Sequence, residues 1–152
     1  MPFITVNGIQ LYYEIDGDGP PLLIISGTGA DLRNPRPANP TLNGFRVVRY
    51  DQRGLGQTAS PKGTYSMADY ADDAASLLDS LEINRINVIG ISFGGMVAQH
   101  LVTRFPNKVN KLVLACTSPG GNNFSSFDLR KIVLSSKNQI ESWLRLLDSR
   151  YK

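Results

Sequence analysis

The amino-acid sequence predicts a single α/β domain with a mostly parallel sheet and helices on both faces. Short apolar runs of strand length alternate along the chain with longer segments in which apolar residues recur every three or four positions. The runs are apolar throughout, which suits strands that are buried on both sides of a parallel sheet. Strands joined by helices imply right-handed crossovers, so the order of the elements predicts the fold class.

The chain is expected to open with a hairpin. Asn7 and Gly8 readily adopt the left-handed backbone of a tight turn, and the residues on both sides have strand character. A Gly- and Pro-rich break precedes the next apolar run, and a Pro- and Asn-rich connection precedes the one after it. The strands predicted in this half are Phe3 to Val6, Ile9 to Ile15, Leu22 to Ile25 and Phe45 to Tyr50.

Helices and strands alternate in the second half of the chain. Ser66 is expected to cap a helix whose apolar face runs from Tyr70 to Leu81. The elements predicted after this helix are a strand from Ile86 to Ile89, a helix from Phe93 to Phe105, a strand from Lys111 to Ala115, and helices from Ser126 to Leu134 and from Gln139 to Arg150.

Composition and charge exclude several classes of protein. With 41% hydrophobic and 19% charged residues and no low-complexity bias, the chain is typical of a globular protein. It has no apolar run of membrane-spanning length and its start lacks the layout of a secretion signal, so a cytoplasmic location is expected. The net charge of +3 arises in residues 130–152, where 6 basic and 2 acidic side chains favour a solvated helix face over a nucleic-acid or membrane partner.

The one cysteine and the one histidine do not form a metal site. Cys116 has no Cys or His neighbour at metal-ligand spacing and has no second cysteine for a disulfide, so a small buried residue at a strand end is expected. The sequence therefore predicts neither a metal nor a cofactor.

One segment carries recognisable chemistry, because a buried strand runs through Gly90, Ser92 and Gly94 directly into a helix. A serine in such a turn has a strained backbone, and small residues are needed two positions to either side. We expect the turn to lift the Ser92 hydroxyl above the carboxyl edge of the sheet, where the Phe93 N–H can stabilise negative charge. Nucleotide-binding loops need other residues at these positions, whereas a purely structural turn stays an alternative.

The loop after the first buried strand is the expected source of a second donor. It reads Ser26-Gly27-Thr28-Gly29, and Gly-rich backbone can approach a ligand closely. The Thr28 N–H is the preferred oxyanion donor and the Gly27 N–H is the next choice. A plain turn is again the alternative.

Three blocks together resemble the α/β-hydrolase superfamily, and most closely its 3-oxoadipate enol-lactonase and small-esterase branch. The blocks are FRVVRYDQRGLGQTASP, YSMADYADDAASLLDSLEINRINVIG and GISFGGMVAQ, and the likeness covers residues 3 to 121. It implies a hydrolase core over residues 1–121, truncated after about six strands, followed by the start of a helical lid over residues 122–152. It also implies that Ser92 attacks a carboxylic ester or lactone, and that Asp51 and Arg53 form a pair that stabilises a loop beside the site.

The partners that such a serine needs are not apparent in the sequence. A serine hydroxyl requires a base, and the base requires an acid, which in this family follow the serine along the chain. His100 lies eight residues after Ser92 in the same predicted helix, so we expect a structural or surface role for it. The loop after Ala115 offers Thr117 and Ser118 instead of an acid, and Asp128 is a remote candidate.

Two classes of function therefore stay open. One is a serine hydrolase of a small-molecule ester or lactone, or an acyl transferase with the same turn, whose base comes from elsewhere. The other is an inactive, truncated hydrolase fold that acts as a binding or interaction module. In either case the strand Lys111 to Ala115 would be an apolar edge, so self-association through it is predicted.

Overall fold

The computed structural model describes residues 2–33 and 42–120 of the 152-residue chain. The chain divides into the units Met1–Pro119 and Gly120–Lys152, and all the described residues except Gly120 belong to the first. The predicted lid over residues 122–152, its two helices and Asp128 lie outside the described residues. The division into core and lid therefore stays a prediction.

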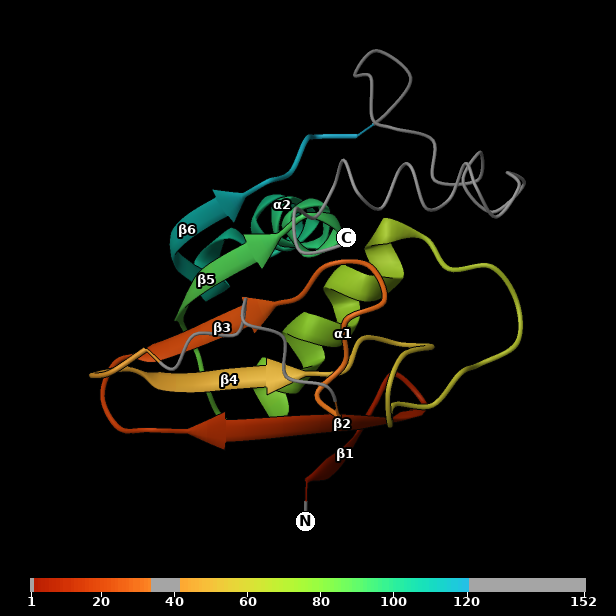
Figure 1. The fold of residues 1–152 in the computed structure, drawn as a ribbon, viewed down its shortest axis with the longest axis horizontal. Helices are drawn as coiled ribbons and strands as arrows, with labels where there is room; N and C mark the ends of the chain where they lie inside the picture. The colour runs from red at the N-terminus through yellow and green to blue at the C-terminus, as the bar shows by residue number, and fades with distance from the viewer. Residues whose placement is uncertain (1, 34–41, 121–152) are drawn as a thin grey trace, which may run out of the picture. The chain divides into compact units, whose positions relative to one another are not determined.

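A six-stranded sheet in the order β1-β2-β4-β3-β5-β6 forms the centre of the described unit (Figure 1). The hairpin strands β1 and β2 are antiparallel, and β2 also pairs antiparallel with β4. From β4 to β6 all pairs are parallel, as the predicted fold class requires. The strands are β1 (Phe3–Val6), β2 (Ile9–Asp16), β3 (Pro21–Ile25), β4 (Arg46–Tyr50), β5 (Ile86–Ile91) and β6 (Val109–Ala115).

In the part of the chain that the structure describes, two helices connect parallel strands. Helix α1 (Met67–Ser80) begins with a capping box, in which the Ser66 hydroxyl accepts from the Asp69 N–H and the Asp69 carboxylate accepts from the Ser66 N–H. Helix α2 (Phe93–Arg104) begins directly after the strand β5, and a short 3₁₀ turn, Pro106–Lys108, leads from it to β6. No helix within residues 2–33 and 42–120 is both long and apolar enough to cross a membrane.

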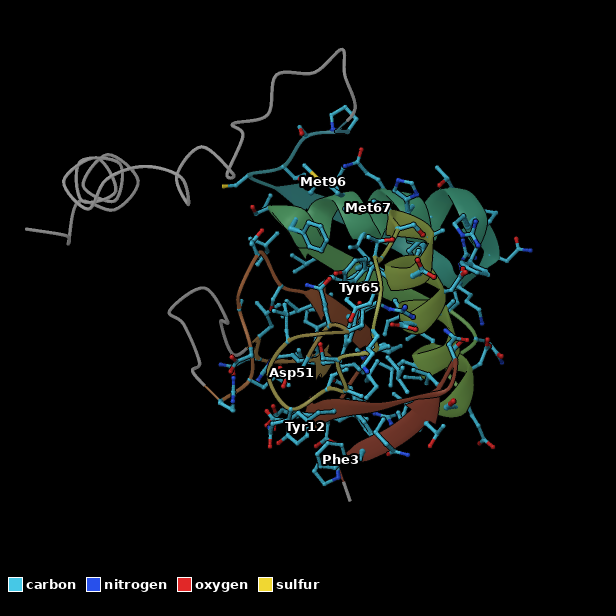
Figure 2. All side chains as sticks on the ribbon, turned by 90° about the vertical axis from the view of Figure 1, so that its right-hand side faces the viewer. Phe3, Tyr12, Asp51, Tyr65, Met67 and Met96 are labelled. Carbon is cyan, nitrogen blue, oxygen red and sulfur yellow. The ribbon has the colours of Figure 1, made fainter. Side chains whose placement is uncertain are left out.

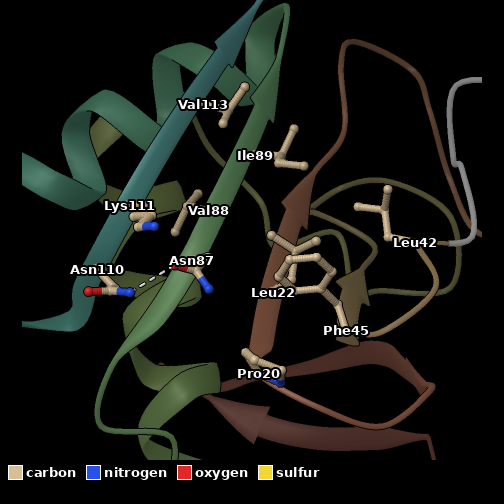
Figure 3. Close-up of a pocket in the computed structure, with 10 residues that line it drawn as sticks. All are labelled: Pro20, Leu22, Leu42, Phe45, Asn87, Val88, Ile89, Asn110, Lys111 and Val113. Carbon is tan, nitrogen blue, oxygen red and sulfur yellow. Dashed lines mark hydrogen bonds between the residues drawn. The ribbon is translucent and has the colours of Figure 1, made fainter.

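Both helices pack on one face of the sheet. Alternate residues of β3 separate the two faces, because Leu23 and Ile25 join the core with α1 and α2, whereas Leu22 and Ile24 point to the other side. On that other side they form a smaller apolar cluster with Val47. A hollow of about 490 Å³ lies there, and the structure describes no helix over it (Figure 3).

The predicted boundaries agree closely with the observed ones. The hairpin turn is at Asn7 and Gly8, with φ angles of 46° and 78°, and Phe3 packs edge to face on Tyr12 across the hairpin with ring centroids 5.1 Å apart (Figure 2). The main differences are that β6 begins two residues before its predicted start and that β5 continues two residues beyond its predicted end. Its last residues pair with Leu114 and Ala115 of β6, and this pairing extends the strand up to the turn.

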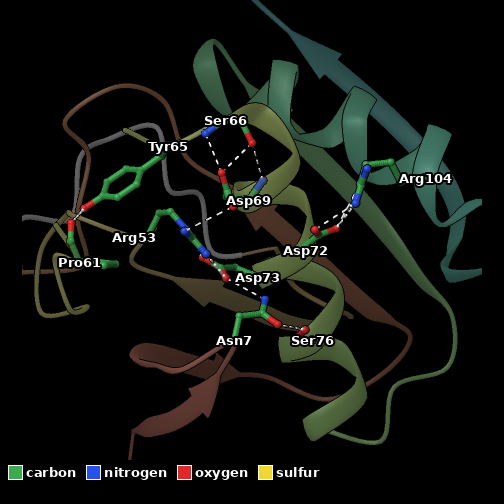
Figure 4. A network of polar contacts seen from close by, with 10 residues as sticks. All are labelled: Asn7, Arg53, Pro61, Tyr65, Ser66, Asp69, Asp72, Asp73, Ser76 and Arg104. Atoms are coloured by element: carbon green, nitrogen blue, oxygen red, sulfur yellow. Dashed lines mark hydrogen bonds and ion pairs between the residues drawn. The ribbon is translucent and has the colours of Figure 1, made fainter. Parts of the chain in front are cut away.

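A buried ion pair joins the hairpin turn, the loop after β4 and helix α1 (Figure 4). The Arg53 guanidinium donates two hydrogen bonds of 2.7 Å to the Asp73 carboxylate, which also accepts from the Asn7 side-chain amide at 2.9 Å. The expectation that Arg53 pairs with Asp51 is therefore wrong: within the described residues its ion pairs are with Asp73 and Asp69. Asp51 stabilises the loop through backbone N–H groups instead.

Candidate active site

The turn at Ser92 has the strained geometry expected for a serine presented at the rim of a sheet. Strand β5 ends at Ile91 and helix α2 begins at Phe93, so Ser92 alone makes the change of direction. Its φ of 53° and ψ of −120° are uncommon for a residue with a side chain. The residue is exposed. The structure thus places Ser92 where a hydroxyl can meet a ligand, and its catalytic role stays a prediction.

Gly90 and Gly94 lie so close to neighbouring backbone atoms that neither position has room for a side chain. A Cβ on Gly94 would lie 2.1 Å from the Ile25 carbonyl oxygen, and a Cβ on Gly90 would lie 2.7 Å from Gly94 and Gly95 backbone atoms. Real Cβ atoms do not approach backbone atoms so closely. The two glycines therefore allow the start of helix α2 to pack directly on strands β3 and β5.

The loop after β6 supports the same turn. The Ser92 N–H donates to the Ala115 carbonyl at 2.9 Å, and the Thr117 hydroxyl donates to the Ser92 carbonyl at 2.7 Å. The Gln99 side-chain amide donates to the carbonyls of Gly95 and Ser118, which ties the helix to this loop. Sequence reasoning missed the supporting role of Thr117 and Gln99. The sequence did contain a signal for Thr117. It follows β6, and β6 runs parallel to β5, so both strands end at the same edge of the sheet.

The loop after β3 lies against Ser92 at Gly27. A Cβ on Gly27 would lie 3.2 Å from the Ser92 Cβ and 3.7 Å from its Oγ. Thr28 is exposed, and the Ala30 N–H donates to the Gly27 carbonyl at 3.2 Å to form a tight turn. The structure therefore brings Gly27 beside Ser92, whereas the assignment of Thr28 or Gly27 as an oxyanion donor stays a prediction.

Hydrogen bonds to carbonyls orient the N–H groups of all three candidate donors. Every described peptide is trans, so the C=O and N–H of one peptide point in opposite directions. The carbonyls that precede Phe93, Gly27 and Thr28 accept from Thr117, from Gln52 and from Ala30, respectively. Each candidate N–H consequently points away from the group that holds its carbonyl.

Asp51 connects two loops at this end of the sheet. Its carboxylate accepts from the Leu32 N–H at 2.7 Å and from the Gln57 N–H at 2.8 Å. The side chain is fully buried, and this burial raises the pKa of Asp51 above its ordinary value, although the two N–H groups oppose the shift. Gly56 packs so closely that a Cβ there would lie 2.1 Å from the carboxylate. Asp51 thus fixes the shape of the loops.

The chain has one histidine, and it lies far from the Ser92 hydroxyl. His100 is in helix α2, eight residues beyond Ser92, which corresponds to about 12 Å along the helix axis. Among the described residues no cluster of three His, Cys, Asp or Glu side chains is arranged to hold a metal ion. Cys116 is exposed with a φ of 51°, so the expectation of a small buried residue at this strand end is wrong.

The hollow, on the face of the sheet over which the structure describes no helix, is separate from the turn at Ser92. Its walls are mainly apolar, and Asn87 and Asn110 add a polar patch where their side chains are hydrogen-bonded at 3.0 Å (Figure 3). Neither Ser92 nor residues 26–29, the part of the loop after β3 that lies beside Ser92, are among the described residues that line it. The hollow therefore does not belong to the candidate active site.

Comparisons with known proteins point to one family. A sequence model of the alpha/beta hydrolase fold matches residues 20–148. The chain is 38% identical over 101 residues to a poly(3-hydroxyalkanoate) depolymerase of Ectopseudomonas oleovorans, with 66% of this chain and 36% of that protein covered. It is 35% identical over 135 residues to a putative carbamate hydrolase of Variovorax paradoxus, with 84% and 51% covered.

Solved structures give the same result. An enol-lactonase from Burkholderia xenovorans is 35% identical with a TM-score of 0.69, and the match covers 76% of this chain and 46% of that one. A hydrolase from Pseudomonas aeruginosa is 31% identical with a TM-score of 0.72, and the match covers 93% and 56%. The chain thus spans about half or less of the length of the curated relatives that it matches.

Proposed function

The chain belongs to the α/β-hydrolase family, and on this premise we propose that it carries the nucleophile and oxyanion hole of a serine hydrolase for a carboxylic ester or lactone. The observation that supports the proposal most is the exposed Ser92 at a positive φ between β5 and α2, with Gly27 packed against it. The enol-lactonase likeness favours a lactone or ester substrate.

The proposed reaction proceeds through an acyl-enzyme. The Ser92 Oγ attacks the acyl carbon while a base takes its proton, and the oxyanion accepts hydrogen bonds from the Phe93 N–H and from the Thr28 or Gly27 N–H. The base returns this proton to the alcohol oxygen as its bond to the acyl carbon breaks; the alcohol departs from an ester, whereas in a lactone it stays attached to the acyl chain. Water then hydrolyses the acyl group from Ser92. An acceptor other than water would turn the same steps into acyl transfer.

The base in this proposal comes from outside residues 1–152 or from a partner chain. His100 is too far along helix α2 to accept the Ser92 proton, and no other histidine occurs in the sequence. The chain alone is therefore expected to react slowly. An added small base can substitute for the missing side chain if the turn is otherwise competent.

A fluorophosphonate probe tests the proposal directly. Without additives the purified chain is expected to remain almost unlabelled, whereas imidazole at high concentration is expected to accelerate labelling, and Ser92→Ala is expected to abolish it. Thr103→Ala in the exposed part of helix α2 is the matched control and is expected to label as the wild type does. Strong labelling without imidazole would contradict the absence of a base.

The second candidate is a non-catalytic module that uses the same fold. The observation in its favour is the distance between Ser92 and the chain's one histidine. A folded chain that imidazole does not render reactive toward the probe would support this candidate and refute the hydrolase proposal.

A further inference from the structure

The side chain of Gln52 holds the loop that lies against Ser92. Gln52 follows strand β4 and is only 1% exposed, yet its Nε2 donates a hydrogen bond of 2.8 Å to the Ser26 carbonyl oxygen. Ser26 immediately follows β3 and precedes Gly27. We infer that Gln52 is a positioning residue for the oxyanion hole, an inference that rests on the function proposed above.

The contact determines the direction of one candidate donor. The Ser26 carbonyl and the Gly27 N–H belong to one planar trans peptide, so a carbonyl held toward Gln52 directs the Gly27 N–H the opposite way. On the other side, the Gly94 Cα lies close enough that an added Cβ would be 2.5 Å from the Ser26 oxygen. The peptide is therefore confined between Gln52 and the start of helix α2.

The Oε1 atom of Gln52 suggests that a contribution to stability alone does not explain why a glutamine occupies this position. Its Oε1 is buried and has no hydrogen-bond partner among the described residues. A buried acceptor without a partner costs about 1–3 kcal/mol, which is comparable to what the Nε2 hydrogen bond contributes. An apolar side chain of similar size would avoid this cost, although it would leave the Ser26 carbonyl without this donor. The glutamine is thus better explained by the orientation that it imposes on the Ser26–Gly27 peptide.

Gln52→Leu separates positioning from stability. The leucine removes the unpaired Gln52 oxygen but leaves the Ser26 carbonyl without its donor, so the two effects oppose each other and the thermal midpoint is expected to stay close to the wild-type value. Imidazole-dependent labelling of Ser92 is expected to fall by about 10- to 100-fold, the usual effect of a small misplacement of catalytic groups. The matched control is Gln10→Leu, which removes an exposed hydrogen bond to Thr5 beside the hairpin turn and is expected to leave labelling unchanged.

The backbone amide of Gly27 gives a second readout that does not depend on chemistry. In ¹⁵N-resolved NMR spectra, Gln52→Leu is expected to shift the Gly27 resonance and to accelerate its hydrogen exchange. Gln52→Glu should restore the wild-type Gly27 resonance at low pH, where a protonated carboxyl can donate to the Ser26 carbonyl, and lose it as the carboxyl ionises.

The two readouts distinguish the possible failures. Unchanged Gly27 and Thr28 resonances in Gln52→Leu would overturn the positioning role, and so would labelling equal to that of the wild type. If the wild-type chain is not labelled even with imidazole, the proposed function fails, and the Gly27 resonance still decides whether Gln52 orients the peptide.

Discussion

At the scale of single residues, the candidate site depends on glycines, because their lack of a side chain lets neighbouring backbone pack closely. Gly94 has a helical position at which alanine would ordinarily be favoured by up to about 1 kcal/mol. Its packing forbids a side chain, because the added Cβ would lie 2.1 Å from the Ile25 carbonyl. The neighbouring atoms belong to the backbone of β3 and cannot rotate away.

Gly94→Ala is therefore expected to destabilise the chain by about 1–3 kcal/mol despite the better helix propensity. Denaturant unfolding followed by circular dichroism measures the change. Thr103→Ala on the same helix, where the side chain is exposed, is expected to change stability by less than about 0.5 kcal/mol. A Gly94→Ala variant as stable as the wild type would show that the contact between α2 and β3 is not required.

Sequence reasoning worked well at this scale for Ser92 and its glycines, because a strand, a turn and a helix within a few residues leave little freedom. It did not identify Thr117, which holds the Ser92 carbonyl from the loop after β6, or Gln52, which holds the neighbouring Ser26 carbonyl from the loop after β4. These contacts depend on the order of strands in the sheet, since β4 and β6 lie on either side of β3 and β5. Local spacing alone carries no information about that order.

At the scale of secondary-structure elements, the buried ion pair between Arg53 and Asp73 holds α1 to the loop after β4. Asp73 is 1% exposed, and its two hydrogen bonds raise the pKa of Arg53 above the ordinary value. The neighbouring residue on the same helix, Asp72, forms an ion pair with Arg104 that is exposed to solvent. Helix α1 therefore offers a buried and an exposed pair at adjacent positions (Figure 4).

Asp73→Ala is expected to lower the free energy of unfolding by about 1–3 kcal/mol, because it removes the main partner of the largely buried Arg53 guanidinium and leaves only Asp69, at 3.9 Å. The matched change, Asp72→Ala, is expected to cost less than about 1 kcal/mol. Urea unfolding of both variants gives the comparison. Equal effects of the two substitutions would contradict the structural role assigned to the buried pair.

The starts of the helices could be predicted from the sequence because the capping and turn residues lie at the positions where the helices begin. The Ser66 cap and the glycine-flanked Ser92 both mark helix starts at the observed positions. The partner of Arg53 was predicted wrongly, since Asp51 is near in sequence whereas Asp73 is near in space. Ion pairs between distant elements depend on tertiary packing, which periodicity does not encode.

At the scale of the whole molecule, strand β6 forms one edge of the described sheet. Val113 and Leu114 on this strand are 54% and 43% exposed, which is unusual for large apolar side chains. An exposed apolar edge presents unpaired backbone groups to another chain. The chain is therefore expected to self-associate in solution.

Analytical ultracentrifugation over a range of concentrations tests this expectation. Val113→Lys places a charge on the edge and is expected to shift the chain toward the monomer. Asn110→Lys adds the same charge to an already polar position of β6 and should have less effect. A wild-type chain that stays monomeric across the concentration range would contradict the prediction.

We propose that the backbone at Ser92 presents a hydroxyl that attacks an acyl group once a base is supplied. The most direct measurement is the position of the adduct after fluorophosphonate labelling in the presence of imidazole, read by peptide mass spectrometry. We predict one phosphonate per chain, on the peptide that contains Ser92. A folded chain without adduct, or with the adduct on another serine such as Ser26 or Ser118, would contradict the claim.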